Sequence, residues 1–411
     1  MFESVKNVKE LIEAHEGLKK EVYLDIENSA PVPKEIIEEM LPYFNEKAYG
    51  HPALTHKPGW EAYETIMEIS SKISRYINAS NLEEINFTHS ETEANNLALL
   101  GCALANKKNG KKIIISEIEP LSILHASELL SKNGFEIIKI PVNNEGLIDL
   151  DKLSKVIDKG TIIVSIMLVN HEIGTIEPIK EAVEIVKDKN PKTVFHTDAS
   201  DAYGKIPIDV KKLDVDLMSL SSYKILGPRG AGALYVKEGT KIERIIEGQI
   251  GTQQLWPDLE NVPSLVGFAK ASELLFKNFD ENFNHMKELR DNLIDGILCK
   301  VDSTILNGPF GEKRAPDNVN ISYLHVEGEA LTIELSLNGI YVSSGSACTR
   351  RILQPSHVLL AIGRKFEEAH GSILMKVTRY HTKSDIDYVL DVLPKAVKRL
   401  RDITGHIENR R

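Results

Sequence analysis

The sequence predicts an α/β protein, with a mostly parallel sheet in a large domain followed by a smaller C-terminal α+β domain. Between residues 34 and 267, short apolar runs alternate with helix-length amphipathic stretches, which is typical of βαβ units whose sheet is covered on both faces. A length of 411 residues also exceeds what one small core needs. The expected strands are 113–116, 136–141, 162–168, 194–197, 217–220 and 233–236.

Three parts are expected along the chain. Residues 1–21 are charged, carry apolar residues at helical spacing, and predict a helical extension. Residues 22–267 should form the large domain, which would bind its ligand at the carboxyl ends of the parallel strands. The small domain is expected over 268–411, because the segment 260–263 has the composition of a turn.

The composition excludes several classes of protein. A net charge of −10 argues against a general nucleic-acid binder, so no direct nucleic-acid partner is expected. The longest apolar run, near 161–169, is too short to cross a bilayer. No secretory signal is recognisable, and we therefore expect a cytoplasmic protein with no membrane partner.

The cysteines are Cys102, Cys299 and Cys348, and none of them forms a C-x-x-C pair. A sparse, odd set fits a reducing compartment and offers no ligand set for zinc, so no metal site is expected. Cys102 and Cys299 lie in apolar segments and should be buried.

Cys348 differs from the other two because it lies in a loop rich in glycine and serine, 342–351. Such a loop can move, and Arg350 and Arg351 are close enough in sequence to favour the thiolate. A reactive thiol is one interpretation of this loop, and an ordinary surface cysteine is the other.

Lys224 is the residue around which the large domain is organised. It follows the apolar run 217–220 and the hydroxyl residues Ser221 and Ser222, and a glycine-rich turn comes directly after it, at 227–230. A lysine held among apolar strands can lose its proton more readily and form a Schiff base with an aldehyde such as pyridoxal 5'-phosphate (PLP). The alternative is a solvated surface lysine.

Asp198 strengthens the cofactor interpretation. It follows the expected strand 194–197 and should lie at the carboxyl end of the sheet, as Lys224 should. PLP needs a carboxylate beside its pyridine nitrogen, so that the ring can accept electrons from a carbanion. An aspartate that caps a helix or stabilises a turn is the alternative.

The segment 88–96, THSETEANN, predicts the start of a helix after a short strand. Free backbone N–H groups and a hydroxyl at such a start bind anions, which makes Thr92 a candidate for contact with the cofactor phosphate. An ordinary capping box would explain the same residues.

Seven motifs occur in one order over nearly the whole chain: 23–25, 87–96, 169–175, 196–199, Lys224 with its glycine turn, 260–263 and 343–349. In these residues the chain resembles the cysteine desulfurase family of class V aminotransferases. The resemblance implies the PLP-dependent transferase fold, of the aspartate aminotransferase type. It also implies a homodimer.

The resemblance further implies a cycle that converts L-cysteine, or a related small amino acid, to alanine. In this cycle Lys224 holds PLP, Asp198 keeps the ring protonated, and Cys348 attacks the substrate sulfur to form a persulfide. A sulfur-acceptor protein, such as an iron–sulfur scaffold or a tRNA-thiolation factor, would then receive the sulfur. The other residues implied to bind the cofactor are Glu91, Thr92, His171, Asp201, Ser221 and Tyr223.

The chain departs from the family pattern at five single residues, three of which are among the cofactor-binding residues just named. Pro120 stands where the family has a histidine stacked on the ring, and it cannot transfer protons. His171 replaces an asparagine, Asp201 a glutamine and Tyr223 a histidine. Asp201 would place a carboxylate near the cofactor's phenolic oxygen and change the pH at which the enzyme is active. Leu374 replaces an arginine that clamps the substrate carboxylate.

Two cations and one hydroxyl are candidates to replace what is missing. Lys376 lies on the same face of an expected strand as Leu374, and Arg379 is close in sequence. Thr252 is a candidate to replace the hydroxyl of the family's serine-glycine-threonine segment, where this chain has 257–259.

Three functions therefore remain open. The first is a PLP-dependent cysteine desulfurase. The second is another class V enzyme that uses Cys348 in sulfur transfer by β-replacement, for example on phosphoserine attached to tRNA. The third is a sulfur-relay subunit that keeps the loop cysteine and has little catalysis.

Overall fold

The computed structural model describes residues 12, 18, 20–249, 251–345, 355–403 and 405. It divides into two compact units. The larger unit comprises Ser29–His171 and Thr175–Phe283, and the smaller comprises Met1–Asn28, Glu172–Gly174 and Asn284–Arg411. The helical extension expected over 1–21 lies largely outside the described residues.

The described part of the larger unit contains a seven-stranded sheet in the order β2-β8-β7-β6-β5-β3-β4. The strands from β7 to β4 are parallel, whereas β8 runs antiparallel to both of its neighbours. All six expected strands are present, and the predicted α/β fold is confirmed. Their bounds are β2 Ile85–Thr88, β3 Lys112–Ser116, β4 Glu136–Ile140, β5 Thr161–Ser165, β6 Val194–Asp198, β7 Leu217–Ser221 and β8 Gly232–Val236.

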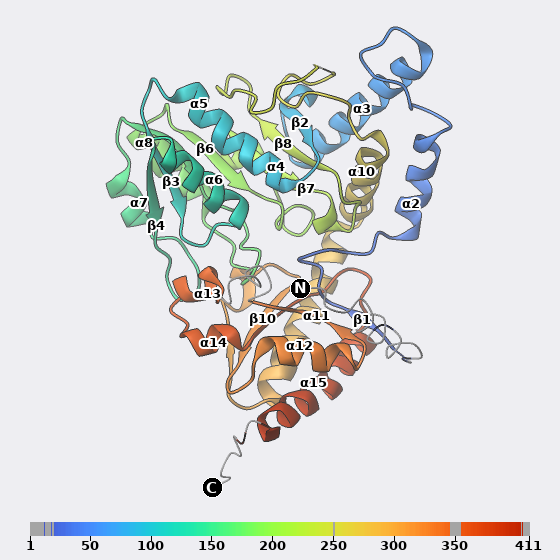
Figure 1. Ribbon diagram of the computed structural model, residues 1–411, viewed down its shortest axis with the longest axis vertical. Coiled ribbons are helices and arrows are strands. Elements are labelled where there is room, and N and C mark those ends of the chain that lie inside the picture. Colours follow the sequence, from blue (N-terminus) through green and yellow to red (C-terminus); the bar gives the residue numbers. More distant parts are fainter. Residues whose placement is uncertain are drawn as a thin grey trace, which may run out of the picture. The chain divides into compact units, whose positions relative to one another are not determined.

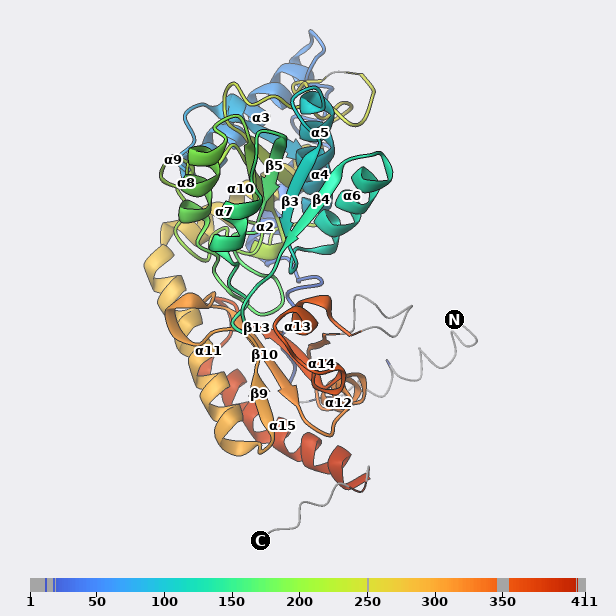
Figure 2. The same cartoon turned by 90° about the vertical axis from the view of Figure 1, so that its left-hand side faces the viewer.

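Helices cover both faces of this sheet, as the apolar composition of its strands requires. Figure 2 shows α7, α8 and α9 on one side of the strands and α4, α5 and α6 on the other. The helices are α2 Lys34–Met40, η1 Leu41–Phe44, α3 Lys57–Tyr76, η2 Leu82–Glu84, α4 Glu91–Asn96, η3 Leu97–Gly101, α5 Cys102–Asn106, α6 Leu121–Lys132, α7 Leu150–Val156, α8 Ile179–Lys189, α9 Val210–Leu213, η4 Tyr223–Ile225 and α10 Val262–Lys277 (Figure 1).

The smaller unit is built on an antiparallel sheet in the order β12-β13-β10-β9, as far as the structure describes it. A short parallel pair, β1 with β11, lies in the same unit. The elements are β1 Val22–Tyr23, α11 Phe279–Lys300, β9 Thr304–Leu306, η5 Gly311–Lys313, β10 Asn318–Tyr323, α12 Gly328–Ser336, β11 Ile340–Tyr341, β12 Ser343–Ser344, α13 His357–Ala361, α14 Phe366–His370, β13 Ser372–Lys376 and α15 Lys383–Ile403.

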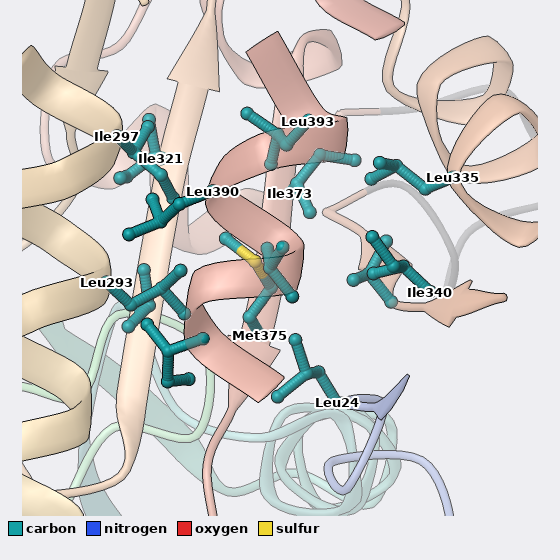
Figure 3. Close-up of a cluster of buried hydrophobic side chains, with 14 of the residues drawn as sticks. Leu24, Leu293, Ile297, Ile321, Leu335, Ile340, Ile373, Met375, Leu390 and Leu393 are labelled. Atoms are coloured by element: carbon teal, nitrogen blue, oxygen red, sulfur yellow. The ribbon is translucent and has the colours of Figure 1, made fainter. Parts of the chain in front are cut away.

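One face of this sheet forms the core of the smaller unit. Figure 3 shows Leu293 and Ile297 of α11, and Leu390 of α15, pointing toward side chains from β10 and β13. Ile321 of β10 is among the strand residues and is fully buried. The core therefore depends on apolar stripes from two long helices laid on two strands.

The boundary between the units differs from the one expected near residue 268. Helix α10 begins at Val262, packs against α2 and α3, and belongs to the larger unit. Asn261 caps this helix by accepting a hydrogen bond from the Ser264 N–H, and Pro263 occupies its first turn. These residues are the start signal of a helix, which in the sequence has the same composition as a turn.

A short segment, Glu172–Gly174, belongs to the smaller unit although both flanking stretches belong to the larger. The side-chain amides of Asn318 and Asn320 both donate to the Glu172 carbonyl, at 3.0 and 3.2 Å. Gly174 has a φ of +71°, and a Cβ there would lie 2.7 Å from Asn318. Position 174 therefore requires glycine, and two hydrogen bonds hold the Glu172 carbonyl beside it.

Among the described residues, no helix is both long and apolar enough to span a membrane.

Leu293→Ala should lower the free energy of unfolding of the smaller unit by about 2–5 kcal/mol, because it leaves a cavity in a closed core. Leu298→Ala, on the exposed side of the same helix, is the matched control and should cost less than about 1 kcal/mol. Urea unfolding followed by far-UV circular dichroism measures both. Equal losses for the two variants would show that Leu293 is not a core residue.

Candidate functional site

Lys224 lies in η4, between β7 and β8, and its side chain is buried. Its Nζ donates a hydrogen bond to Asp201 Oδ2 at 3.0 Å. Leu226, directly after this short helix, has a φ of +66°, and a Cβ on Gly227 would lie 2.2 Å from Ser222 Oγ. The turn after the lysine therefore requires glycine, and it fixes the backbone that carries the amine.

Asp198 is the last residue of β6, and its carboxylate is held by two neutral donors. Asn95 Nδ2 donates to Oδ2 at 2.7 Å, and the Ser200 N–H donates to Oδ1 at 2.9 Å. Burial raises the pKa of Asp198, and these hydrogen bonds oppose the rise. The carboxylate is therefore fixed in direction at the carboxyl end of the parallel sheet.

Asn95 is a site residue that the sequence analysis did not single out. It is fully buried in α4, and its Nδ2 also contacts Ser122 Oγ at 2.9 Å. It lies in the motif 87–96, so the motif was the available signal. The contact with Asp198 depends on how α4 packs, which the sequence does not display.

Lys205 is a second residue that was missed. Its Nζ lies 3.7 Å from Asp201 Oδ1, and the side chains of both residues are almost completely buried. Asp201 is thus flanked by two ammonium groups, one from Lys224 and one from Lys205. Residues 201–205 form turns, so no helical spacing in the sequence indicated this pair.

Two hydroxyl side chains, Ser221 and Tyr223, lie close to Lys224 in sequence. Ser221 ends β7 and is buried, and its Oγ has no hydrogen-bond partner in the part of the chain that the structure describes. Tyr223 is half-buried, with its ring centroid 5.4 Å from the Lys224 Nζ. A buried hydroxyl without a partner indicates a missing ligand, and a phosphate oxygen suits it.

Thr92 is exposed at the second position of α4 and does not cap that helix. Ser90 accepts from the Glu93 N–H at 3.2 Å, and Glu93 Oε2 accepts from the His89 N–H at 2.7 Å. Ser90 therefore caps the helix, and Glu93 holds the residue before the cap. Glu91 is the first residue of α4.

Pro120 and His171 lie on loops that are joined by Asn170. Asn170 is fully buried, and its Nδ2 donates to the Ile118 carbonyl at 3.0 Å. Pro120 precedes α6, and both it and His171 are half-buried. Both belong to the larger unit, as Lys224 and Asp198 do.

These residues fit PLP. The larger unit presents a buried amine, a carboxylate fixed at the end of a neighbouring strand, and a buried hydroxyl that lacks a partner. An aldehyde, a ring nitrogen and a phosphate need these three kinds of group.

In the smaller unit, Cys348 with Arg350 and Arg351 lies outside the described residues. Leu374 and Lys376 occupy the same face of β13, opposite residues 320 and 318 of β10, as expected. Lys376 is buried and forms an ion pair with Glu27.

Two other candidates have protein partners. Arg379 Nη2 donates to the Tyr380 hydroxyl at 2.8 Å. Thr252 donates its hydroxyl to Glu260, which also accepts from the Thr252 N–H at 3.1 Å. The Thr252 hydroxyl is therefore engaged within its own loop.

Of the other cysteines, Cys102 is buried as expected, and burial raises the pKa of its thiol to about 12. The expectation for Cys299 was wrong, because it is exposed on the outer side of α11, next to the exposed Leu298. An apolar neighbour in sequence does not show which face of a helix a residue occupies.

The described residues contain no cluster of side chains that could hold a metal ion.

Comparison with known proteins places the chain in a family. A model of the class-V aminotransferases matches residues 22–389. "Cysteine desulfurase IscS 1" of Archaeoglobus fulgidus is 43% identical over 382 residues, which cover 93% of this chain and 98% of that protein. The chain belongs to the cysteine desulfurase family of class-V aminotransferases. Enzymes of this family depend on PLP, and so does this member.

Solved structures agree with this assignment. A NifS-like protein superposes with a TM-score of 0.85 at 32% identity, covering 94% of this chain and all of the other. SspA, solved in complex with cysteine, superposes with a TM-score of 0.74 at 26% identity over 88% of this chain and all of that one. The predicted PLP-dependent transferase fold is thus confirmed.

Glu119 interacts electrostatically with Asp198, and its pKa is raised. It is fully buried, and its Oε1 accepts from Ser116 Oγ at 2.6 Å and from the Met167 N–H at 3.1 Å. Burial raises the pKa of Glu119 to about 8, and the charge of Asp198 adds to the rise. The folded protein therefore holds a proton on Glu119 between pH 4.5 and 8, where an unfolded chain has lost it.

The contribution of Glu119 to stability should fall as the pH rises through that window. Glu119→Gln cannot ionise, so the free energy of unfolding of the variant minus that of the wild type should increase by up to about 1.4 kcal/mol per pH unit, then level off above pH 8. Both tryptophans, Trp60 and Trp256, lie in the larger unit, so their fluorescence during urea unfolding measures it.

Glu117→Gln is the matched control for this experiment, because Glu117 is partly exposed two residues earlier. This variant measures the effect of removing one carboxylate from the same loop without changing the buried Glu119 side chain. A Glu119→Gln difference that is constant with pH would mean that Glu119 is ionised in the folded protein.

Proposed function

We propose that the protein is a cysteine desulfurase that converts L-cysteine to L-alanine and carries the sulfur as a persulfide on Cys348. The observation that carries this proposal is the buried Lys224 amine, held on a rigid turn in the unit that also fixes the Asp198 carboxylate. The names of the relatives, and the similar SspA solved with cysteine, support the choice of substrate.

Three residues of the larger unit have separate roles in this proposal. Lys224 holds the cofactor through its amine, and Asp198 keeps the ring nitrogen protonated. When bound, PLP supplies an electron sink for a carbanion at the substrate α-carbon. Pro120 covers the ring and cannot move protons, so we assign the α-carbon proton to Lys224 Nζ.

The remaining positions bind and orient the cofactor. We assign the phosphate to Ser221, Thr92 and Tyr223, whose hydroxyl groups can donate to its oxygens. His171 and Asp201 belong beside the phenolic oxygen. Glu91 completes the set at the start of α4.

Cys348 performs the sulfur transfer. Its thiolate attacks the sulfur of the substrate, so an S–S bond forms and the C–S bond breaks, and the carbon takes up a proton and leaves as alanine. The persulfide passes to an acceptor protein for iron–sulfur cluster assembly or tRNA thiolation. The free cysteines among the described residues suit the reducing cytoplasm.

Lys376 is our candidate for the substrate carboxylate. Leu374 cannot bind an anion, and Lys376 is the cation on the same face of β13. Its present partner is the Glu27 carboxylate, and a substrate carboxylate would have to compete with it. A lysine offers a single point charge where an arginine offers two parallel donors.

We also propose that the protein is a homodimer. Large apolar side chains lie exposed in the larger unit on η1, on the segment between η1 and α3, and at the start of α3. We define the apolar patch as Leu41, Phe44, Tyr49, Leu54, Trp60 and Tyr63. Exposed apolar groups of this size mark interaction surfaces. A second copy of the chain is the partner that the family resemblance implies.

Cys348→Ala should reduce alanine formation from cysteine by roughly 10³-fold or more, because it removes the nucleophile, and it should leave the absorbance band of bound PLP unchanged. Lys224→Ala should abolish both alanine formation and the band. Amino-acid analysis and absorbance spectra measure the two properties. Cys299→Ala is the control, and it should behave like the wild type.

Two outcomes would overturn parts of this proposal. Alanine formation that survives Cys348→Ala would exclude the persulfide mechanism. A wild-type protein that binds PLP but forms no alanine from cysteine would favour the sulfur-relay subunit or a β-replacement on another substrate.

Trp60→Glu should weaken dimerisation by about tenfold or more, because it puts a charge into the apolar patch. Sedimentation velocity across a range of protein concentrations measures the dissociation constant. Leu129→Glu, at an exposed leucine of α6 outside the patch, is the matched control and should leave the dimer intact. A Trp60→Glu protein with the wild-type dissociation constant would remove the patch from the interface.

A further inference from the structure

The aspartate at position 201 is placed to act on the reactive lysine and not only on the cofactor. Its Oδ2 accepts a hydrogen bond from Lys224 Nζ at 3.0 Å, and the side chains of both residues are almost completely buried. Its Oδ1 faces Lys205 Nζ at 3.7 Å. A glutamine at this position, as in the family pattern, would carry no charge and could not take a proton.

A buried lysine that reacts with an aldehyde must first become neutral. Loss of the proton to water would leave a buried negative carboxylate without its closest partner, which is costly. Transfer across 3.0 Å avoids that cost: the N–H bond breaks with its electron pair remaining on nitrogen, and the proton bonds to Oδ2. The products are a neutral amine and a neutral acid, and the total charge is unchanged.

We propose that Asp201 exchanges a proton with the Lys224 nitrogen: it takes the proton from Nζ when the cofactor binds and gives it back afterwards. We also propose that Lys205 sets how strongly the Asp201 carboxylate attracts that proton. The proposal rests on PLP being bound through Lys224. The carboxylate stabilises a protonated nitrogen, so it raises the pH at which that nitrogen loses its proton. The second ammonium attracts the same carboxylate and weakens this effect.

The other charged groups nearby cannot supply the same behaviour. Asp198 is engaged by Asn95 and Ser200, and Asp201 adds to the rise of its pKa. On η4 itself, Tyr223 contributes a phenol whose ring faces Lys224.

The titratable side chains on the neighbouring elements do not explain a change at the Lys224 nitrogen. His196 lies on the same face of β6 as Asp198, and burial lowers its pKa to about 3, so it stays neutral. Glu119 keeps its proton up to a pH of about 8. On α10, which packs against η4, Lys270 and Glu273 pair with each other. His171 is present in the wild type and in both variants, so a shift between them does not arise from its substitution.

The test is a pH titration of the absorbance spectrum of the PLP-loaded, full-length protein. The midpoint between the protonated and unprotonated bands reports the Lys224 nitrogen and does not depend on desulfurase activity. Asp201→Asn should lower this midpoint by about one pH unit or more, because the charge is lost in an isosteric change. Lys205→Met should raise it, because the carboxylate then acts on Lys224 alone.

The opposite signs separate this role from a structural one, since general damage would move both variants in one direction. Asp201→Gln replaces Asp201→Asn if the latter does not fold, which tryptophan fluorescence reveals. Midpoints equal to the wild type in both variants, or shifts of the same sign, would overturn the assignment and leave the proposed function intact. A wild-type protein that takes up no PLP would instead overturn the proposed function.

Discussion

The burial of one amine beside one carboxylate constrains the rest of the larger unit. An ammonium group taken out of water costs several kcal/mol unless a partner and hydrogen bonds compensate it. Lys224 and Asp201 come from different segments, so β6 and β7 must be neighbours in register for the pair to form. The glycine after Leu226 and the tight turn after Asp198 serve the same requirement, since each fixes the backbone that carries one of the charges.

Two aspartates three residues apart, Asp198 and Asp201, have different surroundings. Asp198 is held by an amide and a backbone N–H, which fix its direction and add no charge. Asp201 lies between two ammonium groups. The two carboxyl groups therefore have different hydrogen-bond partners and different charges beside them.

The sequence was informative where a pattern is local. Strand positions followed from apolar runs, and Lys224 and Asp198 followed from what flanks them. Contacts made by packing were not visible: Asn95 reaches Asp198 from a helix about a hundred residues earlier. The composition of 260–263 is compatible with a turn and with a capped helix, and only the packing of α10 distinguishes the two. Cys299 shows the same limit, because helical spacing does not say which side faces solvent.

The segment Glu172–Gly174 has a mechanical consequence. It is anchored in the smaller unit by Asn318 and Asn320, yet it is covalently continuous with His171 in the larger unit. Glu172, whose carbonyl accepts these hydrogen bonds, follows His171 directly in the sequence. The Asn318 and Asn320 amides hold the Glu172 carbonyl, so the backbone that directly follows His171 is fixed in position.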